Sequence, residues 1–160
     1  MFEQFSDRAK RVIFLTRLNA GRRGAPALEQ SDLIAALVRE DQGELAKPPF
    51  PGAAVVAGLS PCRPFFSADA ASQILLKIER VSARAEAIPD LADMQMSPAL
   101  SRIFDNALAM HEEFGQTRIE PLHLLAAVLS EQASEASAVL EEVGITREAV
   151  LAAISTGEYS

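Results

Sequence analysis

Residue types able to do chemistry are sparse in this sequence, and none of them is arranged as a catalytic centre. His111 and His123 are the only histidines, and no cysteine or recurrent acidic residue accompanies them at the spacing of a metal site. Serines are numerous, but none stands in the Gly-x-Ser-x-Gly turn that exposes a hydrolase nucleophile. We therefore expect structural histidines, no bound metal or cofactor, and no enzymatic activity.

The single cysteine, Cys62, indicates where the protein works. One cysteine excludes an intramolecular disulfide and suits a reducing compartment. The start of the chain places Glu3 and Asp7 where a signal peptide has basic residues, and no apolar run approaches the roughly 18 residues of a membrane span. We expect a cytoplasmic protein that does not enter a membrane.

The net charge is −7, and it is unevenly distributed. Residues 90–160 hold twelve acidic and three basic side chains, whereas basic residues outnumber acidic ones in residues 1–40. An acidic chain argues against nucleic-acid binding, because phosphates must be met by clustered lysine and arginine. The basic residues of the first segment form either solvated helix faces or an edge for an acidic partner, which includes the acidic half of another copy. They are Arg8, Lys10, Arg11, Arg17, Arg22 and Arg23.

Two segments of the chain are similar to each other. A shift of 91 positions aligns residues 6–40 with residues 97–131 without a gap. Helix starts, helix ends and apolar positions coincide, which indicates an internal duplication. The identical pairs are Ser6/Ser97, Arg11/Arg102, Gly24/Gly115, Glu29/Glu120, Leu33/Leu124, Ala35/Ala126, Ala36/Ala127 and Glu40/Glu131.

Each segment is predicted to form a helix, a short loop and a second helix. Ser6 and Ser97 are of the residue type that caps a helix N-terminus, and Gly24 and Gly115 are of the type that ends a helix. Apolar residues recur three or four positions apart in between. No alternating run is long enough for a sheet, so the fold class is all-α. Further helices are predicted from Asp69 to about Ala87, over Glu131–Val143 and over Thr146–Ser155.

A proline-rich insert at about residues 47–66 interrupts the helical pattern. Its prolines remove backbone donors and force extended geometry, so its opening cannot be helical. The insert contains Phe50, Phe65 and Phe66. Two interpretations are open: these phenylalanines are exposed anchors for a partner, or the insert folds back and caps the bundle.

The two segments resemble the repeats of a known family. The first opens with Phe5-Ser-Asp-Arg-Ala-Lys-Arg-Val-Ile13 and ends with Leu37-Val-Arg-Glu40, and the second contains His123-Leu-Leu125 and Val128-Leu-Ser-Glu131. They are similar to the N-terminal domain of the Clp (Hsp100) unfoldases, also called the Clp repeat domain. The resemblance implies a single domain over residues 1–160, a compact bundle of two pseudo-symmetric repeats with about four helices each. The repeats would be residues 5–88 and 96–156.

The resemblance implies that the protein functions as a binding module. Clp N-terminal domains bind substrates and adaptors, so the implied partner is a polypeptide: a client, an adaptor or a Clp unfoldase. The ATPase modules of an unfoldase carry a Gly-x-x-x-x-Gly-Lys-Ser/Thr phosphate loop, and no Gly-Lys dipeptide occurs here. If 160 residues are the whole product, we expect a stand-alone regulator or adaptor of a Clp protease machine. The alternative, also drawn from the family, is a protein that sequesters small molecules or antimicrobial peptides.

Some family members bind phosphorylated arginine through a threonine near each repeat start and the glutamate of a Gly-Thr-Glu-His motif. The hydroxyls are kept here as Ser6 and Ser97, but the glutamate positions hold Ser31 and Leu122. A guanidinium would lose its carboxylate partner, which argues against phosphoarginine recognition. Helix capping alone also accounts for both serines. The residues expected to contact a polypeptide are Ser6, Arg8, Arg11, Ser97, Phe50, Phe65 and Phe66.

Overall fold

The computed structural model describes residues 4–24, 27–41, 65–81, 95–116, 118–131 and 134–156. Within these ranges the chain forms seven helices and two very short strands, so the predicted all-α class is confirmed. Most of the insert, Phe50 included, lies outside the described residues. The helices are α1 (Asp7–Arg22), α2 (Gln30–Asp41), α3 (Ala68–Val81), α4 (Pro98–Glu113), α5 (Pro121–Ser130), α6 (Glu135–Glu142) and α7 (Arg147–Thr156), and the strands are β1 (Ala27–Leu28) and β2 (Gln95–Met96).

The helices begin and end where the local sequence dictates. The Ser6 hydroxyl accepts from the Ala9 N–H at 3.1 Å, and the Ser97 hydroxyl accepts from the Leu100 N–H at 3.2 Å. Each bond satisfies a donor at a helix N-terminus that has no partner within the helix. Gly24 and Gly115 both have φ of 71°, a conformation that glycine adopts without the strain of a side chain. The first helices of the two segments are therefore bounded in the same way.

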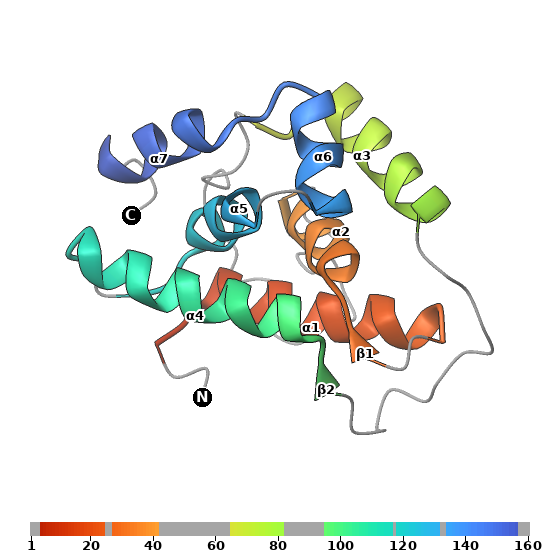
Figure 1. The fold of residues 1–160 in the computed structure, drawn as a ribbon, viewed down its shortest axis with the longest axis horizontal. Helices are drawn as coiled ribbons and strands as arrows, with labels where there is room; N and C mark the ends of the chain where they lie inside the picture. Colours follow the sequence, from red (N-terminus) through yellow and green to blue (C-terminus); the bar gives the residue numbers. More distant parts are fainter. Residues whose placement is uncertain are drawn as a thin grey trace.

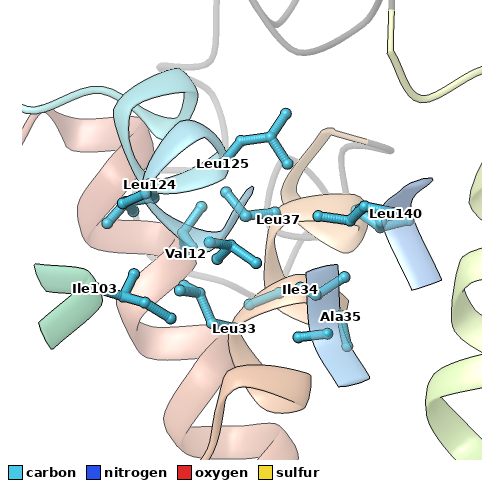
Figure 2. Close-up of a cluster of buried hydrophobic side chains, with 14 of the residues drawn as sticks. Val12, Leu33, Ile34, Ala35, Leu37, Ile103, Leu124, Leu125 and Leu140 are labelled. Atoms are coloured by element: carbon cyan, nitrogen blue, oxygen red, sulfur yellow. The ribbon is translucent and has the colours of Figure 1, made fainter. Parts of the chain in front are cut away.

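The helices pack around a central pair. Figure 1 shows α2 and α5 between α1 and α4 on one side and α3, α6 and α7 on the other. The central position explains why α5 buries nearly every side chain, from Pro121 to Leu129. Figure 2 shows buried side chains of this core, among them Val12 of α1, Leu37 of α2, Ile103 of α4, Leu124 of α5 and Leu140 of α6. Burying each large aliphatic side chain contributes about 1.5–3 kcal/mol to folding.

Backbone hydrogen bonds join the two segments reciprocally. The start of the second segment pairs with the loop before α2: β2 runs parallel to β1, and the Ser97 N–H donates to the Leu28 carbonyl at 2.8 Å. The start of the first segment pairs with the loop before α5, where the Ser6 N–H donates to the Ile119 carbonyl at 3.0 Å and the Ile119 N–H donates to the Gln4 carbonyl at 2.8 Å. Two-residue pairings carry no sequence periodicity, so the sequence did not predict them.

None of the helices in the described ranges combines the length and the apolarity needed to cross a membrane.

Candidate functional site

Arg8 and Arg11, expected at a basic edge, are engaged inside the protein. Nη1 of Arg8 lies 3.0 Å from Oε1 of Glu40, and Nε of Arg11 lies 3.7 Å from the same oxygen. The Glu40 side chain is only 3% exposed. Burial raises the pKa of Glu40, and the two arginines oppose that rise. These arginines thus tie α1 to the end of α2, and the basic edge is smaller than the sequence indicated.

The same ion pair recurs in the second segment, 91 positions on. Nε of Arg102 lies 2.8 Å from Oε1 of Glu131, but the Arg102 side chain is 60% exposed. The repeated Arg–Glu spacing was visible in the aligned sequences and could have indicated the contact between Arg11 and Glu40. Burial differs between the two pairs, so we expect them to contribute unequally to stability.

Ser6 and Ser97, expected to contact a partner, are buried and serve as helix caps. Burial raises the pKa of Glu120, while the neighbouring Ser6 side chain and the charges of Arg8 and Arg118 oppose the rise. Leu122, at the second of the family's glutamate positions, is 1% exposed. The structure therefore gives both hydroxyls internal partners.

Phe65 and Phe66, the two described phenylalanines of the insert, both pack in or against the core. Phe66 is fully buried, which favours the second of the two interpretations, packing against the bundle, over an exposed anchor for a partner. Phe65 is partly buried and packs against the same core. Burying an aromatic ring in the bundle gains more free energy than leaving it in water, which accounts for the buried position of Phe66.

His111 and His123 form a buried structural pair between α4 and α5. Nδ1 of His123 accepts from the Glu120 N–H at 2.8 Å, so Nε2 carries the proton and donates to Oε1 of Gln116 at 2.5 Å. Burial, together with the neighbouring His111, lowers the pKa of His123 to about 4. Gln116 in turn donates to the Ile154 carbonyl of α7 at 3.2 Å. No three potential ligands gather at a metal-binding distance among the described residues.

A groove of about 420 Å³ lies between the end of α1, α2 and α3. We call it the arginine–leucine groove. Arg22 and Arg23 line it at the end of α1, Arg39 lines it from α2, and Leu75, Leu76 and Ile78 line it from α3. Leu76 is 51% exposed. It falls outside the apolar periodicity of α3, and this was the signal by which the sequence could have indicated the groove.

Hydrogen bonds fix the basic wall of the groove. Nε and Nη2 of Arg23 both donate to the Asp32 carboxylate at 2.8 Å, and this bidentate bond raises the pKa of Arg23. Asn19 donates to the Asp32 carbonyl at 3.2 Å and accepts from Arg39. Arg22, in the last turn of α1, is exposed to solvent. One side of the groove therefore carries guanidinium groups, two of which are fixed by hydrogen bonds, and the other side is the apolar surface of α3.

The family follows from the sequence. The model of the Clp repeat (R) N-terminal domain matches residues 67–143 and 95–156, which together span more than half of the chain. The chain belongs to the Clp N-terminal domain family. The matched residues of this Clp N-terminal domain cover α3 to α7, whereas the opening motif at residues 5–13 lies outside them. No curated protein sequence matches the chain.

Solved structures show the same fold at low identity. The N-terminal domain of the chaperone ClpD from Arabidopsis thaliana is 19% identical, with a TM-score of 0.65 over 98% of this chain and 95% of that one. The Hsp104 N-terminal domain from Candida albicans is 14% identical, with a TM-score of 0.69 over 99% and 94%. A structure from a study of a malarial protein secretion system is 17% identical, with a TM-score of 0.72 over 98% and 95%. These likenesses establish the fold of this Clp N-terminal domain.

Proposed function

We propose that this Clp N-terminal domain is a non-enzymatic, polypeptide-binding module that regulates a Clp protease machine or acts as its adaptor. The observation that carries the proposal is the family match over more than half of the chain, because this domain binds substrates and adaptors in Clp unfoldases. The partner is therefore a Clp unfoldase, another adaptor or a client polypeptide.

The surface of the domain is compatible with this role. Polypeptide recognition needs an accessible apolar contact with polar groups around it, held on a rigid support. The arginine–leucine groove offers exposed Leu76 beside Arg22, on helices fixed to the core by the Arg23–Asp32 bond and by Ile78. Arg8 and Arg11 support this scaffold through their ion pairs with Glu40.

Degradation of a fluorescent model client by a purified Clp unfoldase and its peptidase tests the proposal. Adding the domain at micromolar concentration should change the degradation rate, and titration calorimetry should detect binding to the unfoldase, to an adaptor or to the client. The reaction with an unrelated small helical protein is the control. Unchanged degradation, together with no heat of binding to any of the three by folded domain, contradicts the proposal.

The second candidate function is sequestration of small molecules or antimicrobial peptides. It is favoured by the volume of the groove, about 420 Å³, which lies within the range of small-molecule sites. A ligand that binds only the folded domain must raise its melting temperature. A library of small molecules and cationic peptides that leaves the melting temperature unchanged removes this candidate.

A further inference from the structure

We infer that the arginine–leucine groove docks a polypeptide segment in which a large apolar side chain lies beside carboxylates. The inference rests on the proposed function and adds to it the place of binding and the chemistry of the bound segment. Two observations carry it: an exposed leucine at a formed groove, and a set of arginines on the facing helices.

The exposure of the apolar side chains on α3 increases from the interior of the groove to the surface. Ile78 is 7% exposed and belongs to the core, Leu75 packs partly against that core, and Leu76 is half exposed. A leucine in this position leaves apolar area in water that an incoming side chain would cover, which is the driving force for association. The lining therefore selects a segment with a large apolar residue.

The opposite wall selects charge. Arg23 is neutralised by its two bonds to Asp32, whereas Arg39 is held by Asn19 and Arg22 extends into solvent. Arginine presents a planar fork of donors that matches a carboxylate. Glu79 is a lining carboxylate from α3, so it favours carboxylates docked toward α1 and α2 rather than toward α3. The charges of the groove thus favour binding of an acidic segment and also its orientation, with its carboxylates toward α1 and α2.

A second copy of the chain offers similar chemistry, but its geometry argues for a separate partner. On α4, Asp105, Leu108 and Glu112 are exposed at spacings of three and four residues, which puts them on one helix face. Docking that face into the groove of another molecule would join two different surfaces. Such a head-to-tail contact adds molecules without limit unless its rotation closes a ring. We therefore assign the groove to another polypeptide and treat self-association as an outcome of the test.

Fluorescence anisotropy with a labelled helical peptide tests the inference. The probe is an alanine-based peptide with a leucine between two glutamates on one face, and its matched forms carry lysines for the glutamates or serine for the leucine. We expect the acidic leucine peptide to bind best, and more weakly as salt is added. Equal binding of the lysine form overturns the inference.

Variants of the groove locate the binding. We expect Leu76→Ser to weaken binding of the acidic leucine peptide about ten-fold and Arg22→Gln to weaken it about three-fold. Leu108→Ser and Lys10→Gln are matched controls, because both residues are exposed and lie outside the groove. Leu76→Ser changes an exposed position, so the variant should fold normally. Equal affinities for the groove variants and the controls overturn the inference.

A second probe separates failure of the inference from failure of the proposed function. If wild type and Leu76→Ser bind unfolded casein equally, while neither binds the peptide, polypeptide binding stands and the groove assignment is wrong. If folded wild type binds neither casein nor peptide, and no Clp unfoldase or adaptor either, both fail. Sedimentation velocity that shows concentration-dependent association, abolished by Leu108→Ser or Leu76→Ser, overturns the inference in favour of a second copy.

Discussion

Arg8 lies 3.0 Å from Glu40, and the carboxylate that it neutralises is almost completely removed from water. The two residues are 32 positions apart and hold the first turn of α1 against the end of α2. Burial raises the pKa of Glu40, so the ionised form depends on its arginine partners. The pair is therefore structural, and its removal should affect stability before it affects binding.

Replacing Arg8, which lies in a buried ion pair, should cost more stability than replacing Arg102, which corresponds to Arg11 and lies in an exposed pair. Arg8→Ala leaves Glu40 buried with Arg11 as the remaining cation at 3.7 Å, and we expect a loss of about 2–4 kcal/mol. Arg102→Ala breaks the exposed pair with Glu131 and should cost at most about 1 kcal/mol. Urea unfolding followed by circular dichroism measures both. Equal losses in the two variants would show that burial does not distinguish the pairs.

Mild acid should destabilise the domain through His123. The pKa of this residue is 6.5 in the unfolded chain and about 4 in the folded one, so the unfolded state takes up the proton first. The stability that neutral His123 contributes is complete above pH 6.5 and is lost as the pH falls toward 4, by about 3 kcal/mol in total. Urea midpoints measured between these pH values report the loss.

A variant isolates this contribution from the carboxylates. The raised pKa values of Glu40 and Glu120 act in the opposite sense, because the folded state then binds protons more readily as the pH falls. His123→Asn keeps a side-chain acceptor for the Glu120 N–H but does not titrate. Its stability should therefore fall less than that of wild type between pH 6.5 and 4. If wild type and His123→Asn lose stability equally between pH 6.5 and 4, the acid sensitivity belongs to another group.

The two capping serines should matter for stability and not for polypeptide binding. Ser97→Ala removes the acceptor for the Leu100 N–H and should cost about 1 kcal/mol. Ser6→Ala removes the acceptor for the Ala9 N–H and should cost a similar amount. Thermal unfolding measures the stability of each variant, and fluorescence anisotropy with unfolded casein measures its polypeptide binding. A Ser6 variant that keeps its melting temperature but loses casein would make Ser6 a contact residue after all.

Phe66 should behave as a core residue. Phe66→Ala removes a fully buried ring, and the lost burial together with the cavity should cost about 3–5 kcal/mol. Phe14→Ala is the matched control, since Phe14 is 52% exposed, and it should change stability little. Chemical denaturation compares them. A loss of binding by Phe66→Ala with full retention of stability would support its interpretation as an anchor for a partner.

The sequence was most informative where structure is decided locally. Ser97 and Gly115 mark the two ends of α4 as predicted, because a cap and a left-handed glycine act within one helical turn. Contacts between distant residues were missed for the same reason: nothing near Arg8 in the chain points to Glu40. Phe66 was ambiguous because the partners of an aromatic ring depend on the packing of α3 against the bundle. The groove was missed because its lining residues come from α1, α2 and α3, which the sequence alone does not bring together.

The backbone hydrogen bonds that join the start of each segment to the other segment limit how the domain can be cut into two separate chains. Ser6 finds its backbone acceptor at Ile119, and Ser97 finds its acceptor at Leu28, so each half completes the edge of the other. One half expressed alone would leave these backbone groups without their native partners. Two identical halves arranged about a twofold axis would restore both junctions at once. In the covalent domain, each segment therefore supplies backbone partners that the other segment would otherwise lack.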